Sequence, residues 1–290
     1  MIGFAPAKIN VGLFITEKRA DGYHNLESVF WPISWCDVLE VHPSDSPGLN
    51  LQVSGLEIPG ISEDNLIHRA YRLIQESFDI GGVDAHLLKT IPMGAGLGGG
   101  SSDGTCMLKL LNDLFGLNIT PDLGRTMAQE LGADCPFFWE AQPVLVSGIG
   151  ERMSPLPDLF HPLKNAFITI IHPGLHISTA EAFKHINPAP SEINWSELAT
   201  TSIDKWSRYL RNDFTTYATA VHPVINEIMK ALSRAGASYT QMTGTGSAVY
   251  GIFDSQEEAN SAAGMANSNG WIAHSSKLSD GTHFGAKKPA

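Results

Sequence analysis

The sequence has few cysteines, few basic residues and no long apolar run. Only Cys36, Cys106 and Cys135 occur in 290 residues, and no Cys-x-x-Cys pair or Cys/His cluster has zinc-site spacing. No stretch approaches the roughly 18–20 apolar residues that span a bilayer, and no basic and apolar signal segment follows Met1. We therefore expect a cytoplasmic protein with reduced thiols, without a disulfide framework or membrane contact.

Acidic residues outnumber basic residues. Nineteen Lys and Arg stand against 30 Asp and Glu, which gives a formal net charge of −11. This balance argues against nucleic acids and anionic membranes as partners. It does not exclude a small anionic ligand, because distant surface charge is screened over roughly 8 Å at physiological salt. Such a ligand has to be bound by local N–H groups, a few lysines and a divalent cation.

Glycine is concentrated in the segment PMGAGLGGGSS, from Pro92 to Ser102. Five glycines so close together carry an entropic cost of roughly 0.5–1 kcal/mol each relative to alanine in a regular element. An amphipathic helix pattern follows over 102–116, and Ser101 and Ser102 are its expected N-caps. A glycine loop before a helix presents free N–H groups and the positive end of the helix dipole to an anion. We interpret the segment as a phosphate-binding loop rather than a linker.

Two common phosphate-binding motifs fit this loop poorly. The P-loop pattern requires a lysine before the hydroxyl residue, where this chain has Gly100. The dinucleotide pattern is formally met by Gly94, Gly96 and Gly99, with Asp113 about twenty residues further on. Asp113, however, falls inside the helix pattern, and a further helix pattern follows where a second strand is required. A P-loop NTPase and a Rossmann oxidoreductase are therefore both disfavoured.

The order of predicted elements indicates an α+β fold, because strands and helices do not alternate regularly. Strands are predicted at 8–16, 24–34, 38–42, 49–54, 85–90, 167–172, 238–243 and 248–253. Helices are predicted at 65–78, 102–116, 121–131, 179–185, 204–220, 223–235 and 256–267, and a tail at 281–290. A proline-rich crossing at 155–157 suggests two domains, 1–155 and 156–290.

The glycine segment resembles the ATP-binding motif of the GHMP small-molecule kinases. Its GLGGGSS form is most similar to the kinases that act on 4-diphosphocytidyl-2-C-methyl-D-erythritol. Other blocks fit the same kinases in order along nearly the whole chain: APAKINVGL, DGYHNLESVF, GADCPFF, SGIGERMSPL and TGTGSAVYGIF. The resemblance implies an N-terminal ATP-binding domain like domain 2 of ribosomal protein S5, a ferredoxin-like C-terminal domain on the substrate side, and an active site in the cleft between them.

The resemblance also implies an activity. It is ATP- and Mg²⁺-dependent phosphorylation of the 2-hydroxyl of 4-diphosphocytidyl-2-C-methyl-D-erythritol, a step of the non-mevalonate route to isoprenoid precursors. The substrate then carries a cytidine diphosphate group, and the protein is a monomer or a weak homodimer. Two alternatives stay open: another GHMP kinase, of the homoserine or mevalonate type, or a non-catalytic nucleotide-binding regulator. The expected ATP-binding residues are Lys89, Pro92, Met93, Gly94, Ala95, Gly96, Leu97, Gly98, Gly99, Gly100, Ser101 and Ser102.

Phosphoryl transfer to an alcohol needs a group that accepts the hydroxyl proton and nearby positive charge. By itself, Asp134 in GADCPFF is more typical of a turn cap than of a base, and Lys8 in APAKIN is more typical of a solvated strand residue. The resemblance implies that Asp134 is the base and that Lys8 keeps it ionised. It also implies that Asn10 orients both and is one of the substrate-binding residues. Lys89 is a second candidate cation for the nucleotide or a solvated lysine. No metal ligand is assigned.

Tyr23 and His24 follow a turn and by themselves suggest a hairpin. The resemblance implies that a cytosine ring stacks on Tyr23 and Phe183 while His24 reads its edge, although Phe183 also fits a core position. Gly244 and Thr245 are expected to face the site from the second domain. Asp103 is an unexpected carboxylate at the helix start. It is favourable there only if it caps the helix, points away or helps to hold Mg²⁺.

Overall fold

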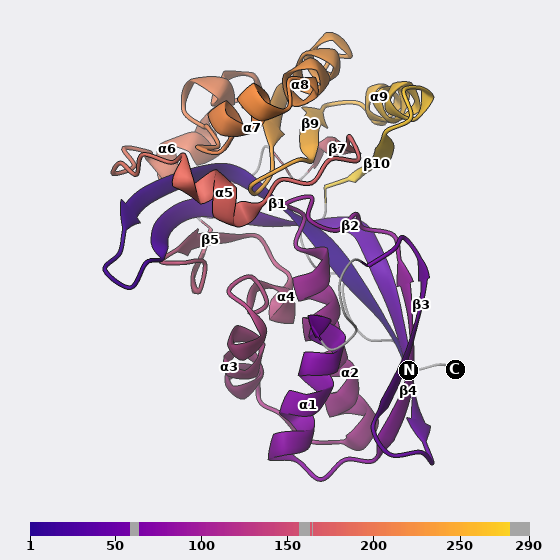
Figure 1. Ribbon diagram of the computed structural model, residues 1–290. Coiled ribbons are helices and arrows are strands. Elements are labelled where there is room, and N and C mark those ends of the chain that lie inside the picture. The colour runs from indigo at the N-terminus through magenta and orange to yellow at the C-terminus, as the bar shows by residue number, and fades with distance from the viewer. Residues whose placement is uncertain (59–63, 157–162, 164, 279–290) are drawn as a thin grey trace.

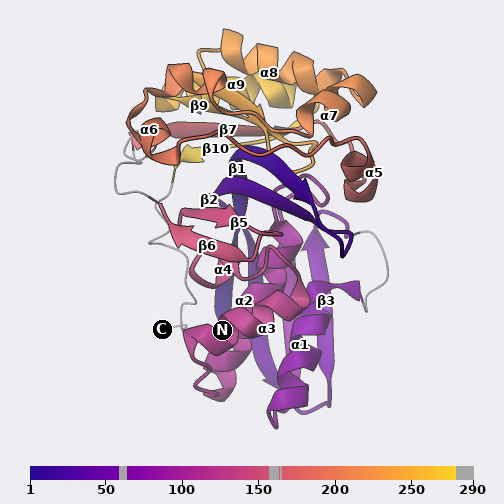
Figure 2. The same ribbon diagram turned by 90° about the vertical axis from the view of Figure 1, so that its left-hand side faces the viewer.

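The first 155 residues form one sheet with helices on one face (Figures 1 and 2). The computed structural model describes residues 1–58, 64–156, 163 and 165–278, so that Pro157 and the expected tail lie outside the described residues. The sheet order is β3-β4-β2-β5-β6, with β1 also paired to β2. The strands are β1 (Ile2–Lys18), β2 (His24–Ser44), β3 (Leu49–Gly55), β4 (Gly82–Lys89), β5 (Val144–Ser147) and β6 (Arg152–Pro155). The helices are α1 (Leu66–Ser77), α2 (Gly99–Phe115), α3 (Pro121–Leu131) and α4 (Phe137–Glu140).

The strands β1 and β2 are longer than the sequence pattern indicates. The predicted strands 24–34 and 38–42 are one strand, β2, and β1 extends on both sides of the predicted 8–16. The pairing of β2 with β1 slips at Pro6/Ala7, where the two predicted segments of β2 meet. Its first half pairs with β5 and its second half with β4. The apparent gap is therefore a bulge, which interrupts the alternation of side chains without ending the strand.

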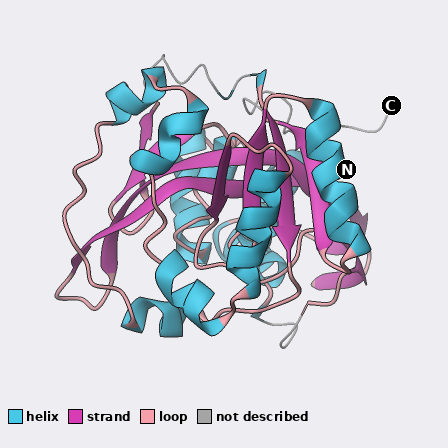
Figure 3. Cartoon of the chain, turned by 90° about the horizontal axis from the view of Figure 1, so that it is seen from above, coloured by secondary structure: helices cyan, strands magenta, loops and turns pink. Residues whose placement is uncertain are grey.

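The second half of the chain forms a four-stranded antiparallel sheet in the order β10-β7-β9-β8, with helices across it (Figures 1 and 3). Its strands are β7 (Phe167–His172), β8 (Tyr239–Met242), β9 (Val249–Phe253) and β10 (Ile272–Lys277). Its helices are α5 (Thr179–Lys184), α6 (Trp195–Thr200), the 3₁₀ helix η3 (Ile203–Arg208), α7 (Thr215–Val221), α8 (Val224–Arg234) and α9 (Gln256–Ser268). The helix predicted at 204–220 is wrong. It is divided into η3 and α7, because Leu13 on β1 bonds the backbone at Arg211 and Asp213.

The long β1–β2 hairpin connects the two halves of the molecule (Figure 1). One buried cluster contains Ile9 of β1 and Trp31 of β2 together with Ile168 of β7 and Tyr250 of β9. The Tyr250 hydroxyl donates to the Asn10 carbonyl at 3.0 Å. The two parts thus share a core, which holds them in a defined relative position. In the described residues no helix has both the length and the apolar character that crossing a bilayer requires.

The contact between the two parts of the molecule can be tested by pH, because it includes the ring of His274 on β10. Its ring stacks on Trp35 of β2 with centroids 5.0 Å apart, and burial lowers its pKa to about 4. The unfolded chain binds this proton near the usual pKa of about 6.5, so the stabilisation is complete above pH 6.5 and is lost as the pH falls toward 4. We expect the free energy of unfolding to fall by about 2 kcal/mol between pH 7.5 and pH 5 through this group.

Urea unfolding at both pH values measures the loss. The variant His274→Gln should show a smaller decrease than the wild type, while His42→Gln, which removes an exposed histidine, should not. Equal pH dependence in the wild type and His274→Gln would contradict the assignment.

Candidate active site

The glycine loop connects β4 to α2 and ends directly in the helix. Helix α2 begins at Gly99, three residues before the predicted start, and Gly98 is its N-cap with φ of +71°. Ser101 and Ser102 therefore lie in the first turn and are not caps, because the chain enters the helix through a left-handed glycine. The N–H groups of a first helical turn have no carbonyl partner within the helix. They are available to an anion, and the helix dipole favours its negative charge.

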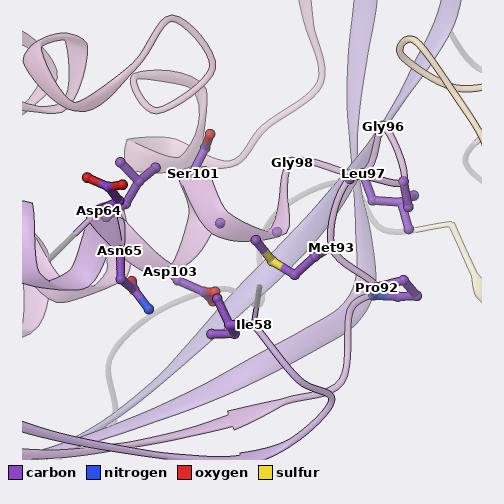
Figure 4. A pocket seen from close by; sticks show the side chains of 15 residues that line it. Ile58, Asp64, Asn65, Pro92, Met93, Gly96, Leu97, Gly98, Ser101 and Asp103 are labelled. Carbon is purple, nitrogen blue, oxygen red and sulfur yellow. The ribbon is translucent and has the colours of Figure 1, made fainter. Parts of the chain in front are cut away.

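The loop separates two cavities. The first, of about 330 Å³, is lined by the loop itself, by Asp64, Asn65 and Leu66 at the start of α1, and by Ile58 and Asp103. Figure 4 shows the residues at the start of α1 and those of the loop facing each other across it. The second, of about 230 Å³, contains Lys8 and Asp134. Gly94, Gly96 and Gly98 line both cavities.

The loop is also in contact with the second domain across the cleft. The Ala248 N–H donates to the Ala95 carbonyl at 3.1 Å, and Thr243 Oγ1 donates to the Gly96 carbonyl at 3.2 Å. A Cβ built on Gly96 would lie 2.2 Å from the Thr243 carbonyl oxygen. Two backbone segments therefore approach so closely that only glycine fits, which explains why this position carries one.

Lys8 and Asp134 come together in the second cavity. Lys8 Nζ lies 3.7 Å from Asp134 Oδ2; its side chain is 5% exposed, and that of Asp134 is 37% exposed. Burial lowers the pKa of Lys8, and the charge of Asp134 opposes this effect. The exposed carboxylate can thus reach a ligand while a buried cation lies beside it, which is the arrangement expected for a proton acceptor near a reacting hydroxyl.

Asn10 is buried, and its polar side-chain atoms are used within the protein. Its Oδ1 accepts from Lys8 Nζ at 2.7 Å and from the Gly244 N–H at 3.1 Å, while its Nδ2 donates to Ser28. Asn10 also lines the second cavity, so that its binding of the substrate stays a prediction. Its geometry fits the orienting part of the prediction, since it fixes the Lys8 ammonium relative to the second domain.

Lys89 lies outside both cavities. Its ammonium donates to Asp37 and, at 2.7 Å, to Asp103 Oδ2, and its side chain has no solvent exposure. Lys89 is therefore not the solvated lysine of the alternative reading, because its charge is paired with two buried carboxyl groups, and its role toward the nucleotide stays a prediction. Asp103 points at Lys89, which explains how a carboxylate is accommodated at the start of α2.

The residues predicted for the acceptor are only partly brought together. Phe183 lines the second cavity with Gly244 and Thr245, and its ring stacks on His24 with centroids 4.7 Å apart. Tyr23 is 61% exposed and lines neither cavity. A ring stacked between Tyr23 and Phe183 would have to displace His24 from Phe183.

Sequence reasoning missed several cavity residues. His176 lies between β7 and α5, Thr179 is the first residue of α5, and Phe214 precedes α7. Asn65 caps α1 and lines the first cavity. His176 packs on the loop so closely that a Cβ on Gly94 would lie 2.4 Å from its Nδ1. Asparagine is a preferred N-cap residue, so a local signal could have indicated Asn65 at the start of α1. Nothing local distinguishes Phe214 from a core residue.

Comparisons with known proteins agree with this architecture. Residues 65–140 match the GHMP kinases N terminal domain and residues 196–270 the GHMP kinases C terminal domain. A protein of Bacteroides thetaiotaomicron named 4-diphosphocytidyl-2-C-methyl-D-erythritol kinase is 46% identical over 256 residues, which cover 88% of this chain and 92% of that protein. A protein of Bacteroides fragilis with the same name is 44% identical over 89% of this chain and 94% of its own.

A solved structure is also similar over nearly its whole length. The crystal structure of a 4-(cytidine 5'-diphospho)-2C-methyl-D-erythritol kinase superposes with a TM-score of 0.80 at 30% identity, covering 95% of this chain and 98% of that one. The predicted two-domain α+β kinase fold is thereby confirmed. This chain belongs to the GHMP kinases and, within them, to the family of 4-diphosphocytidyl-2-C-methyl-D-erythritol kinases.

Proposed function

We propose that this protein transfers the γ-phosphoryl group of ATP to the 2-hydroxyl of 4-diphosphocytidyl-2-C-methyl-D-erythritol. The observation that carries the proposal is the glycine loop between two cavities, one at the start of α2 and the other containing Lys8 and Asp134. A nucleotide in the first cavity and an alcohol in the second would meet at the loop. The acceptor is taken from the names of the relatives, which resemble this chain over most of its length.

The chemistry assigned to each side chain follows from this arrangement. The 2-hydroxyl oxygen forms a bond to the γ-phosphorus while the bond from that phosphorus to the β-phosphate oxygen breaks, releasing ADP. The hydroxyl proton passes to the Asp134 carboxylate. The Lys8 ammonium, oriented by Asn10, supplies positive charge beside the developing alkoxide. First-turn N–H groups of α2 bind phosphate oxygens.

Magnesium enters this scheme as part of the substrate, the MgATP complex. The described residues contain no group of three or more His, Cys, Asp or Glu side chains arranged to hold a metal ion. Mg²⁺ commonly keeps several waters and binds substrate phosphates with few protein ligands. We therefore assign no protein ligand to it.

Residues 1–155 are proposed as the ATP-binding part and 156–290 as the part that completes the acceptor cavity. Phe183, Gly244 and Thr245 support the second assignment, because they line that cavity from the C-terminal half. We further propose that the protein acts in the cytoplasm, where ATP is available.

The direct experiment is an assay by phosphorus NMR. The protein, ATP, Mg²⁺ and 4-diphosphocytidyl-2-C-methyl-D-erythritol are expected to give ADP and the 2-phosphate. Turnover with homoserine or mevalonate and none with the cytidylated substrate would refute the proposed acceptor. ATP binding without turnover of any of the three alcohols would favour a regulator.

Phe183 should control the affinity for the acceptor. Stacking of a base on an aromatic ring contributes about 1–3 kcal/mol, so Phe183→Leu is expected to raise the KM for the cytidylated substrate about 5- to 150-fold. Leucine keeps apolar contact with the Phe214 ring, which packs edge-on to Phe183, so the fold should persist. Steady-state kinetics with each substrate varied in turn measure the effect.

The KM for ATP should stay unchanged in Phe183→Leu. Tyr209→Leu, which removes an exposed ring that lines neither cavity, is the matched control. An unchanged KM for the acceptor in Phe183→Leu would exclude stacking on this ring.

A further inference from the structure

A group of buried charges beneath the glycine loop is not used in the proposed transfer. It consists of Asp37 on β2, Lys89 at the end of β4 and Asp103 on α2, and we call it the Lys89 clamp. Lys89 Nζ donates to one oxygen of each carboxylate, and the three side chains are 0–3% exposed. Buried charges cost desolvation free energy unless they are paired and hydrogen-bonded. A cluster of this kind therefore raises the question of which parts of the chain its hydrogen bonds hold in place.

The clamp holds both ends of the loop. Asp37 Oδ1 accepts from the N–H groups of Thr90 and Ile91 at 2.5 and 2.8 Å, where the chain leaves β4 and enters the loop. Asp103 lies in the first turns of α2, where the chain leaves the loop. One ammonium therefore ties the entry of the loop to its exit through two carboxylates.

The position of the ammonium also matters for an anion. A Cβ built on Gly99 would lie 3.0 Å from Lys89 Nζ, so the charge lies against the first residue of α2. A cation is unfavourable at a helix N-terminus, because that end of the dipole is already positive. The Asp37 carboxylate and the hydrogen bond to Asp103 offset it in the free protein. An anion bound at the loop experiences the helix dipole and the ammonium together.

The protonation of Asp103 limits the negative charge near this anion site. Burial, with the nearby Asp37, raises the pKa of Asp103 to about 8, against the effect of Lys89. Asp103 Oδ1 is buried without a hydrogen-bond partner among the described residues, which leaves it free to carry a proton. Burial alone lowers the pKa of Lys89, but the two carboxylates outweigh burial and raise it. The remaining titratable neighbours, the thiols Cys36 and Cys106, have pKa values raised to about 12 by burial.

We propose that Lys89 is a positioning residue for the nucleotide: held by Asp37 and Asp103, it fixes the loop in its phosphate-binding shape and adds a buried positive charge beneath it. The inference rests on the proposed function, since it assumes that the loop binds ATP. Lys89 acts through the loop and does not contact the ligand.

The test separates charge from folding. Lys89→Met leaves the buried Asp37 carboxylate without its cation, next to the buried carboxyl group of Asp103, and is expected to lower the melting temperature and weaken ATP binding. The double variant Lys89→Met/Asp103→Asn replaces this second carboxyl group with a neutral amide, so its melting temperature should recover toward that of the wild type. Its Kd for ATP, titrated without acceptor, should still be about tenfold higher, because the cation beneath the loop is absent. Its KM for the acceptor should change less than twofold.

Each outcome decides the proposal. A folded double variant that binds ATP as tightly as the wild type would show that Lys89 only supports the fold. A double variant that does not fold would refute the charge balance on which the proposal depends. The control Lys109→Met removes a lysine of α2 whose Nζ donates to the Trp139 carbonyl, and this variant should keep the ATP affinity of the wild type. Wild-type protein that does not bind ATP would refute the proposed function itself.

Discussion

Asp134→Asn is expected to lower kcat about 10²- to 10⁴-fold while the Kd for ATP stays unchanged, because general-base assistance contributes rate factors of this size. The asparagine amide cannot accept the hydroxyl proton, yet it has nearly the shape of the carboxylate. Asp134 lines the cavity of Lys8 and not the cavity at the start of α2, so the nucleotide should bind as before. Steady-state kinetics and an ATP titration of the same preparation measure both quantities.

The matched control is Asp122→Asn on α3. Its carboxylate is 92% exposed and pairs with Arg125 at the surface, so kcat should be that of the wild type. In Asp134→Asn, the buried Lys8 ammonium keeps its position but loses the negative charge that lies 3.7 Å away in the wild type. A kcat for Asp134→Asn within a few-fold of the wild type would remove Asp134 as the base.

The second large effect is expected from Gly96→Ala. Gly96 has φ of +78°, and a Cβ there would lie 2.2 Å from the Thr243 carbonyl oxygen. The left-handed conformation costs a non-glycine residue about 1–2 kcal/mol, and overpacking adds about 1–3 kcal/mol. The free energy of unfolding should therefore fall by about 2–5 kcal/mol. ATP binding should weaken as well, because the loop cannot keep its shape against the second domain.

Urea unfolding and an ATP titration measure the two effects of Gly96→Ala. Gly264→Ala on α9 is the control, because a Cβ at that position meets nothing within 4 Å. A helical alanine is favoured over glycine, so this change should stabilise the protein by about 0.5–1 kcal/mol. A Gly96→Ala protein as stable as the wild type would mean that the loop and the second domain are not in tight contact in solution.

The chemistry-bearing segments could be recognised from the sequence because they are local. The glycine run requires a close backbone approach wherever it occurs, and the approach of Gly96 to Thr243 is of this kind. Lys8 and Asp134 lie far apart in the chain, and only the family resemblance predicted that they meet. Their 3.7 Å separation agrees with it. The alternation of apolar residues likewise predicted most strands and helices of the described chain.

Errors arose where a distant partner overrides a local pattern. The bulge in β2 opposite Pro6 and Ala7 was mistaken for a strand end. The alternation of apolar and polar side chains breaks there, and the sequence of β2 alone does not show that its pairing with β1 continues beyond the bulge. The helix predicted at 204–220 is interrupted where its backbone bonds Leu13 on β1. The start of α2 was misplaced because Ser101 and Ser102 are good caps in isolation, whereas the loop enters the helix through Gly98.

The sequence by itself determined the family, through blocks that resemble known kinases along the chain, and the α+β fold class, through the order of its strand and helix patterns. Only the tertiary structure decided what each charged side chain does. Lys89 precedes the loop by a few residues, and the sequence alone suggested either a cation for the nucleotide or a solvated lysine. Its ammonium is buried and donates to Asp37, which lies more than fifty residues earlier, and to Asp103. The partner of a charge is set by which strands and helices the fold places side by side, and a linear pattern does not contain that information.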